Sequence, residues 1–175
     1  MFDNFVRIMF AKQRWLLVLQ GLGTTLLISF CAVLIGSILG CIFALLKISK
    51  NKVLNGIANV YTTVIRGIPM ATLLMIFYFV IFAPIGLQNT IVVAIIAFGI
   101  NSGAYCTEIF RAGIQGVDKG QEEAGRSLGL SWWQTLSKII LPQAIRTILP
   151  TFTSEFITMI KETSVASFIA VVDLQ

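Results

Sequence analysis

Two long stretches of this chain contain no charged residue, and they constrain its fold more than any other feature. The first runs from Trp15 to Leu46 and the second from Gly67 to Thr107. Because a helix needs about 20 residues to cross the hydrocarbon core of a bilayer, the first stretch holds one long or tilted span and the second a good part of two. Charged residues make up 12% of the chain, about half their share in soluble domains. The sequence therefore predicts an all-α integral membrane protein.

The apolar segments predict one transmembrane domain over residues 1–175. Spans are expected at 15–46, 55–82, 90–110 and 143–160. A proline lies inside two of them, Pro69 in the second and Pro150 in the fourth. Since proline lacks the backbone N–H donor, we expect Pro69 to kink the second span and Pro150 to break the fourth.

Three further segments flank these spans. Residues 1–14 place apolar side chains at helical spacing, which predicts a helix lying in the membrane interface. Residues 115–142 form a polar hairpin in an otherwise apolar chain. Residues 161–175 contain an apolar part that is too short to span, and we expect them to lead toward a further span.

The basic residues predict the orientation, because cytoplasmic loops carry an excess of Lys and Arg. With the hairpin in the cytoplasm, seven loop residues lie on that side and three lie on the side of the N-terminus. The seven are Lys47, Lys50, Lys52, Arg111, Lys119, Arg126 and Lys138, and the three are Arg7, Lys12 and Arg14. We therefore expect the hairpin inside and the N-terminus outside.

The residue types present narrow the possible functions. The chain has no histidine, which removes the commonest general base and metal ligand, so we expect no catalytic residue and no metal site. Three cysteines lie in apolar runs without paired spacing and are expected to be packing residues. The net charge of +5 comes from basic residues dispersed at span ends, so nucleic-acid binding is not expected.

The hairpin carries the signals of two short helices. Asp118 with Gln121, and Ser131 with Gln134, fit the capping-box pattern, and Gly129 falls where a first helix would end. We expect helices at 119–128 and 132–141. On the second helix one face is apolar and can lie against the membrane-embedded body; it consists of Trp132, Leu136, Ile139 and Ile140.

On the first helix, Ala124 and Gly125 are small enough to let another backbone approach, with Glu122 and Glu123 beside them. The alternative is an amphipathic loop resting on lipid headgroups, in which these acidic residues have no partner. Spacing favours the first interpretation. It resembles the E-A-A, x3, G, x9, I-x-L-P motif of ATP-binding-cassette (ABC) importer permeases, on Glu123, Ala124, Gly125, Gly129, Ile139, Leu141 and Pro142, with Gly125 where the family usually has alanine.

The resemblance extends over most of residues 60–168. The blocks "YTTVIRGIPMATLLMIFYF", "NSGAYCTEIFRAGIQGVDKGQ" and "LPQAIRTILPTFTSEFITMIKETSV" look like the polar amino acid branch of that family. It implies a permease subunit in the bacterial inner membrane with a five-helix core. Family members continue past the position of Gln175 into a fifth span, so four core helices are expected here, and the chain is either a fragment or unusual.

In that family the motif forms a coupling helix that inserts into a cleft of a separate ATPase subunit. The resemblance therefore implies that ATP and magnesium belong to the partner and that this chain holds no cofactor. It implies a coupling set of Glu122, Glu123, Ala124, Gly125, Gly129, Leu141 and Pro142. The implied partners are two ATPase subunits, a second permease subunit in a homo- or heterodimer, an extracytoplasmic amino-acid-binding protein and membrane lipid.

Ionisable residues at membrane depth are costly, so they are candidates for a substrate pathway. Arg66 offers a planar fork of donors to a substrate carboxylate; alternatively, carbonyls freed by Pro69 satisfy it. Glu155 has no neighbour of opposite charge in sequence and needs a partner, for which Arg66 or Arg146 are the options.

Two further groups complete the expected pathway. Asn101 and Ser102 form a small polar break in the third span, for which close helix packing at Gly103 is the alternative explanation. The stretch Lys161, Glu162, Thr163 and Ser164 is expected to end a helix and begin a non-helical segment. It resembles a family block that borders the substrate path, and Lys161 with Glu162 offers a cation and an anion to a zwitterion. The alternative is an interfacial snorkelling pair.

Another function class also remains open at this point. An ion-coupled secondary amino acid carrier also uses broken helices and buried charges. Such a carrier usually has internal repeats, which are not evident here, and it needs no coupling hairpin. A membrane enzyme is disfavoured, because no nucleophile has a base near it in sequence.

Overall fold

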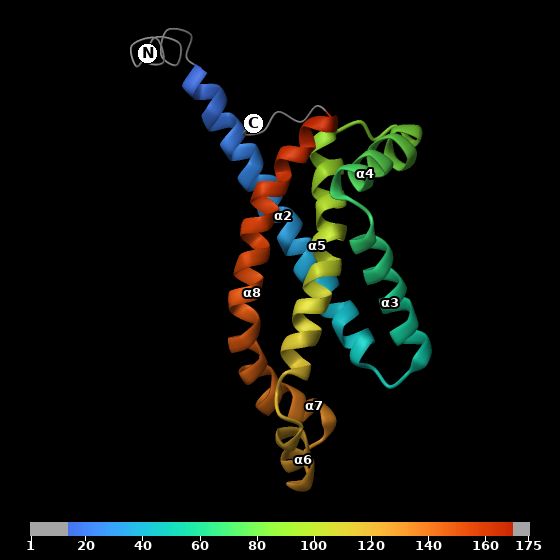
Figure 1. Cartoon of the computed structure of the whole chain (residues 1–175), viewed down its shortest axis with the longest axis vertical. Helices are drawn as coiled ribbons and strands as arrows, with labels where there is room; N and C mark the ends of the chain where they lie inside the picture. The colour runs from blue at the N-terminus through green and yellow to red at the C-terminus, as the bar shows by residue number, and fades with distance from the viewer. Residues whose placement is uncertain (1–13, 170–175) are drawn as a thin grey trace.

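The computed structural model describes residues 14–169, and this part of the chain is almost entirely helical (Figure 1). The predicted interfacial helix at 1–14 and the last residues of 161–175 lie outside the described residues. The elements are α2 (Arg14–Ile48), α3 (Lys52–Gly67), α4 (Met70–Met75), η1 (Ile76–Phe82), η2 (Ala83–Ile85), α5 (Thr90–Gln115), α6 (Lys119–Ser127), α7 (Trp132–Thr135), η3 (Leu136–Ile140), α8 (Leu141–Glu162) and η4 (Thr163–Ile169).

Helices α2 and α5 are each long and apolar enough to cross a membrane, and they pack closely along much of their length. Glycines on both helices permit this approach. A Cβ atom on Gly36 would lie 2.6 Å from Ser102 Oγ, and one on Gly99 would lie 2.8 Å from Ile35 Cγ2. Because lipid tails are as apolar as the helices, such close backbone packing is what stabilises helix association in a bilayer.

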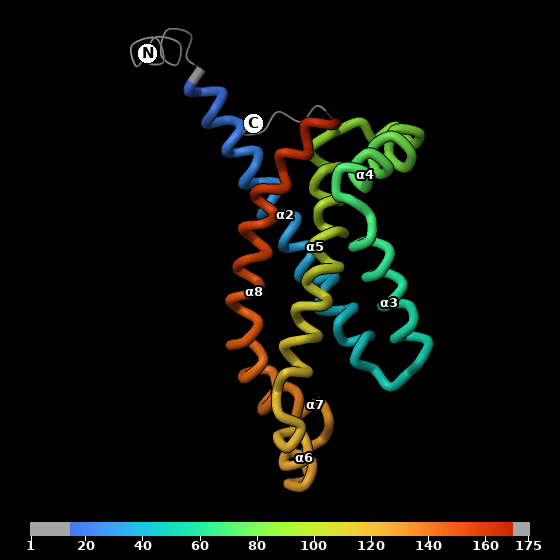
Figure 2. The backbone as a smooth tube through the Cα atoms, in the orientation of Figure 1, coloured from blue at the N-terminus to red at the C-terminus, as the bar shows by residue number. Residues whose placement is uncertain are grey.

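The predicted span at 55–82 is not a single kinked helix. Helix α3 and the helical segment Met70–Ile85, which begins with α4, are related by an angle of 104°, and the chain turns sharply between α3 and α4 in Figure 2. Ile68 has φ −99° and ψ 128°, and Pro69 has φ −56° and ψ 138°. Both residues are extended, as expected where proline excludes the helical conformation of the residue before it. The prediction of a kink was therefore wrong, and α3 ends at Gly67.

Helix α8 continues through Pro150, so the predicted break in the fourth span was also wrong. Ala144 and Met159, on either side of the proline, are fully buried, and α8 packs along α5. These contacts pack both halves of the helix against the rest of the protein. Pro142 does not end the preceding helix either, because it lies in the first turn of α8, directly after the π-helical turn η3. The first turn of a helix tolerates proline.

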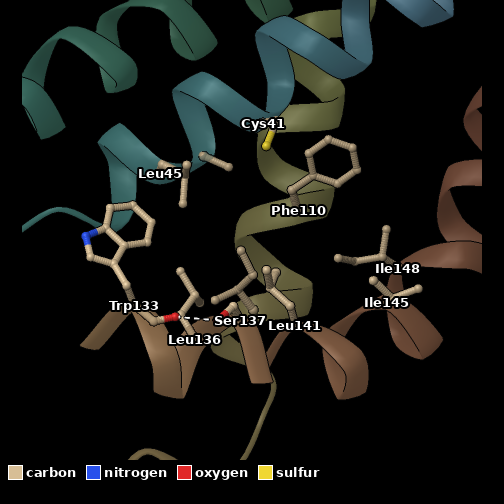
Figure 3. A pocket seen from close by; sticks show the side chains of 11 residues that line it. Cys41, Leu45, Phe110, Trp133, Leu136, Ser137, Leu141, Ile145 and Ile148 are labelled. Carbon is tan, nitrogen blue, oxygen red and sulfur yellow. Dashed lines mark hydrogen bonds between the residues drawn. The ribbon is translucent and has the colours of Figure 1, made fainter. Parts of the chain in front are cut away.

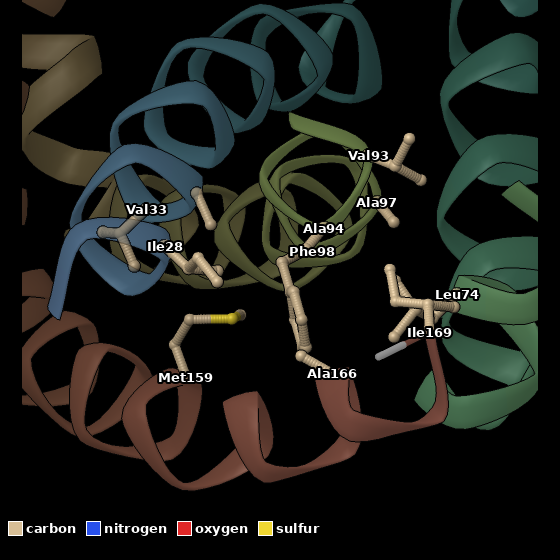
Figure 4. Close-up of a cluster of buried hydrophobic side chains, with 11 residues drawn as sticks. Ile28, Val33, Leu74, Val93, Ala94, Ala97, Phe98, Met159, Ala166 and Ile169 are labelled. Atoms are coloured by element: carbon tan, nitrogen blue, oxygen red, sulfur yellow. The ribbon is translucent and has the colours of Figure 1, made fainter. Parts of the chain in front are cut away.

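The main core lies at the end of the bundle opposite the hairpin (Figures 1 and 4). Phe98 of α5 is completely buried there, with Ile28 of α2 and Met159 of α8. Leu74 of α4 and Ala166 of η4 close the cluster, since α4 and η4 are in contact. Helix α4, which follows the 104° turn, is thus held in place by η4, which lies much later in the sequence.

Candidate functional site

The polar hairpin, formed by α6 and α7, extends beyond the ends of the long helices (Figure 1). Its second helix begins with the predicted capping box: the N–H of Ser131 donates to Gln134 Oε1 at 2.8 Å, and the N–H of Gln134 donates to Ser131 Oγ at 3.3 Å. At the first helix the box does not form. Asp118 Oδ1 instead accepts the N–H of Gly120 at 2.6 Å, so Asp118 caps α6 without Gln121.

Gly129 makes the turn between the two helices, as its position predicted. Its φ is +81°, a left-handed conformation in which a Cβ atom is unfavourable. The N–H of Leu130 reaches back to the carbonyl of Gly125 at 3.2 Å, and the N–H of Gly129 to that of Arg126 at 3.0 Å. These bonds satisfy the last carbonyls of α6 and fix the direction of the chain.

Gly125 faces into the hairpin rather than outward. It is buried, and a Cβ atom on it would lie 2.8 Å from Thr135 Cγ2 and 3.0 Å from Ile139 Cδ1. The expectation that Gly125 lets a partner's backbone approach is therefore wrong. Its small size instead lets α6 pack against the helix that continues into α8.

The predicted apolar face of the second hairpin helix is confirmed in part. Leu136 and Ile140 are buried and face Ile48 and Ile114 of the long helices, whereas Trp132 is 38% exposed. This face anchors the hairpin to the membrane-embedded body.

The outer surface of α6 is open. Glu122, Glu123 and Ala124 are exposed, and Leu128 at the helix end is 81% exposed. Neither glutamate forms an ion pair within the described part of the chain, where both ion pairs involve Glu108. These exposed side chains leave carboxylate groups and the apolar side chain of Leu128 open to another molecule.

Leu141 and Pro142, the other two residues of the coupling set, lie elsewhere. Leu141 lines an apolar cavity with Phe110, and Pro142 is exposed in the first turn of α8. They belong to the junction of the hairpin with α8, not to the outer surface of α6.

A polar cluster ties three helices together near the hairpin end. Arg111 pairs with Glu108, three residues earlier on α5, at 2.8 Å. Glu108 also pairs with Lys47 of α2, which in turn donates to Thr62 Oγ1 of α3 at 2.9 Å. Sequence reasoning missed Lys47, because it lies 61 residues from Glu108 and no local spacing relates the two.

Several residues predicted for the pathway gather along α5, which packs against both α3 and α8. Ser102 Oγ, which is fully buried, donates to Glu155 Oε1 at 3.5 Å. Arg66 and Glu162 interact electrostatically with the same carboxylate. The guanidinium of Arg66 lies 4.9 Å from the centre of the Tyr105 ring, a cation–π contact. Asn101 is also buried.

Some expected partnerships differ in the structure. Among the described residues Glu155 forms no ion pair with Arg66 or Arg146, and Ser102 is its hydrogen-bond donor. The guanidinium of Arg66 contacts the ring of Tyr105 rather than carbonyls near Pro69. A packing role for Gly103 is confirmed, since a Cβ atom there would lie 2.6 Å from Tyr61 Oη.

The expected helix end within residues 161–164 is confirmed, because α8 ends at Glu162, but the expected non-helical segment after it was wrong. That segment forms the 3-10 helix η4, in which Thr163 is buried and donates to the carbonyl of Ile160 at 2.8 Å. Ser164 Oγ donates to the carbonyl of Lys161 at 2.9 Å. Lys161 is exposed, and it does not pair with Glu162 within the described part of the chain. Successive helical residues point about 100° apart, so these two side chains leave α8 in different directions.

A polar stripe on α8 was not recognised in the sequence. Its members are exposed and recur every three or four residues, which places them on one helix face: Thr147, Thr151, Ser154, Thr158 and Lys161. Glu155 lies beside it. The helical periodicity of these polar residues is the signal in the sequence that predicts the stripe.

Known proteins resemble this chain over most of its length. A family model described as "binding-protein-dependent transport system inner membrane component" matches residues 16–174. A probable amino-acid ABC transporter permease protein, YckA, of Bacillus subtilis is 43% identical over 90% of this chain and 70% of its own length. A putative glutamine transport system permease protein, GlnP, of Rickettsia bellii is 42% identical over 99% of this chain and 79% of its own.

The fold is also similar to that of a solved structure. A crystal structure of an amino acid ABC transporter with histidines superposes with a TM-score of 0.86 at 40% identity, over 94% of this chain and 77% of that one. The helical arrangement is thus that of an ABC permease.

Proposed function

The chain belongs to the family of binding-protein-dependent transport system inner membrane components, as an amino acid ABC importer permease, and we propose that it moves a polar amino acid across the bacterial inner membrane. In this proposal α2, the bent pair α3 and α4, α5 and α8 supply four spans of a five-helix core. The hairpin lies in the cytoplasm and the N-terminus outside, as the basic residues favour. An ion-coupled carrier finds no support, because the relatives named above are ABC transporter permeases.

The outer surface of α6 is the proposed contact with an ATPase subunit. The exposure of this surface is the observation that supports the coupling role. Glu123 and Ala124 are exposed there, Glu122 is exposed toward the side of Lys50 and Arg126, and Gly125 is packed inward. Pressure on α6 would act through Gly125 on Thr135 and Ile139, which belong to the helical run that continues into α8. ATP and magnesium would be held by that partner subunit, which leaves no cofactor for this chain.

The proposed substrate path runs along the polar stripe of α8. A stripe of hydroxyls and a lysine is costly against lipid, so it favours contact with water, substrate or a second permease subunit. Arg66 and Glu155 provide opposite charges near each other, which suits the carboxylate and ammonium groups of an amino acid. An extracytoplasmic binding protein would deliver the substrate to this path.

Transport by the reconstituted complex tests the proposal. We would place the permease and its ATPase subunits in proteoliposomes, supply the amino-acid-binding protein, and measure ATP-dependent uptake of glutamine, the substrate named for one relative. Ala124→Leu should leave the thermal unfolding temperature unchanged but weaken ATPase binding at least tenfold, because its side chain faces outward.

The inward position next to it provides the matched control. Gly125→Leu should lower the unfolding temperature, because a large side chain collides with Thr135 and Ile139. Uptake that continues without the ATPase subunits and follows an ion gradient would refute the importer mechanism.

A further inference from the structure

An apolar slot lies between the ends of the long helices and the base of the hairpin (Figure 3). Its walls come from Cys41 and Leu45 of α2, Phe110 of α5, and Trp133 and Leu141 of the α7–α8 run. The cavity measures about 390 Å³, within the range of roughly 300–1,000 Å³ typical of ligand sites.

The slot offers almost nothing to a polar molecule. Ser137 is the one hydroxyl of its lining, and it donates to the carbonyl of Trp133 in its own helix at 2.7 Å, as the dashed line in Figure 3 marks. The remaining walls are aliphatic or aromatic, apart from the thiol of Cys41. A hydrocarbon chain is the ligand that such a lining suits.

A second cavity, of about 670 Å³, adjoins the slot and shares Leu45 and Trp133 with it. Its wall includes Lys50 and Arg126, and the Arg126 guanidinium is held by a hydrogen bond to the carbonyl of Leu130 at 3.0 Å. Glu122 is the one carboxylate in this wall. Two cations face one anion, so the wider cavity favours a negatively charged group.

The two cavities have the spacing of a lipid headgroup and its tail. Lys50 follows the end of α2, and Cys41 lies nine residues earlier, about 14 Å along the helix axis. Trp133 stands where the cavities meet and is 64% exposed. An indole at the junction of an apolar and a polar region is typical of the membrane interface.

We propose that the slot and the wider cavity together bind one anionic phospholipid. An acyl chain lies between Leu45, Phe110 and Leu141, and the phosphate lies between Lys50 and Arg126. Such basic pockets at helix ends are a known way to hold anionic lipid. The lipid would join the hairpin to α2, so the activity of the importer would depend on membrane composition. Its place in the cytoplasmic leaflet follows from the proposed topology.

Quenching of tryptophan fluorescence by brominated lipids tests the site. The full chain has three tryptophans, and Trp15→Phe leaves Trp132 and Trp133 as reporters at the cavities. In nanodiscs, dibromo-phosphatidylglycerol should quench at least twofold more strongly than dibromo-phosphatidylcholine at equal mole fraction. The double variant Lys50→Gln with Arg126→Gln should remove this difference, while Lys138→Gln with Arg146→Gln, outside both cavities, should keep it.

The slot has its own matched pair of variants. Cys41→Phe fills the slot and should abolish the preference, whereas Ile42→Phe, next to it on the exposed face of α2, should not. Equal quenching by the two lipids in the Trp15→Phe parent, or a preference that survives either change at the site, would overturn the proposal. If a variant fails to fold, a second measurement on the Trp15→Phe parent replaces it. Alkylation of Cys41 by N-ethylmaleimide must be slower in phosphatidylglycerol than in phosphatidylcholine, and equal rates overturn the proposal.

Discussion

Ser102 donates a hydrogen bond to Glu155 across the contact of α5 with α8, at 3.5 Å. This bond joins a fully buried hydroxyl to a carboxylate that lies beside the polar stripe of α8. Helices α5 and α8 therefore meet through polar atoms at the depth where Arg66 of α3 also acts on the carboxylate.

Replacement of this carboxylate should affect transport more than folding. For Glu155→Gln we expect the unfolding temperature to stay within a few degrees, because an amide keeps the shape and can still accept from Ser102. ATP-dependent uptake should fall at least tenfold, since the negative charge is lost. Thr153→Ala is the control: its hydroxyl bonds to Leu149 of its own helix, and uptake should be retained. Wild-type uptake by Glu155→Gln would remove Glu155 from the pathway.

The effect of Gly129 on ATPase binding can be distinguished from a general loss of stability. Gly129→Ala and Gly86→Ala each place a Cβ atom at φ +81°, and each should destabilise the protein by about 1–2 kcal/mol. Only Gly129→Ala should also weaken association with the ATPase subunits, as measured by co-purification after reconstitution. A matching loss with Gly86→Ala would show that lowered stability alone accounts for the effect.

The pair Lys47 and Glu108 should show energetic coupling. Both side chains are largely buried, with 13% and 20% exposed, so Lys47→Met leaves a carboxylate that is only partly compensated by Arg111. We expect each of Lys47→Met and Glu108→Gln to destabilise the protein, with a coupling energy of about 0.5–3 kcal/mol in a double-mutant cycle. Reversible unfolding in mixed micelles measures it. Additive losses would mean that the pair contributes nothing of its own.

The contact of α2 with α5 should depend on Gly36 but not on Gly23, which also lies on α2. A Cβ atom on Gly36 would meet Ser102, whereas one on Gly23 would have nothing within 4 Å. Gly36→Leu should therefore lower the unfolding temperature strongly or prevent accumulation of the folded protein. Gly23→Leu should be tolerated. Equal behaviour of the two variants in thermal unfolding would contradict the close packing described for these helices.

Local signals in the sequence were sufficient for the spans and for most of the hairpin. The uncharged run from Trp15 to Leu46 predicted α2 because hydropathy acts along a single helix. Ser131 with Gln134, and Gly129, predicted their cap and turn because these motifs involve residues three or four positions apart. The family resemblance was also readable from the order of residues alone, since it consists of a motif spacing and three sequence blocks.

Predictions that depended on distant packing were less successful. A proline within a helix can kink it, break it or be tolerated. At Pro69 the helix ended and the following segment packed against η4, while at Pro150 contacts with α5 kept the helix intact. The orientation of Gly125 and the partner of Lys47 likewise depend on which elements meet, and the sequence of one element does not contain that information.

The chain remains helical without interruption from Trp132 to Glu162. Within this run α8 has 22 residues, or about 33 Å at 1.5 Å per residue, so a tilt of about 10° at its hairpin end would move its other end through about 6 Å. No hinge has to bend for a small rotation at one membrane face to become a large displacement at the other. The amplitude of the motion would then be set by helix length, and its direction by where α5 provides the pivot.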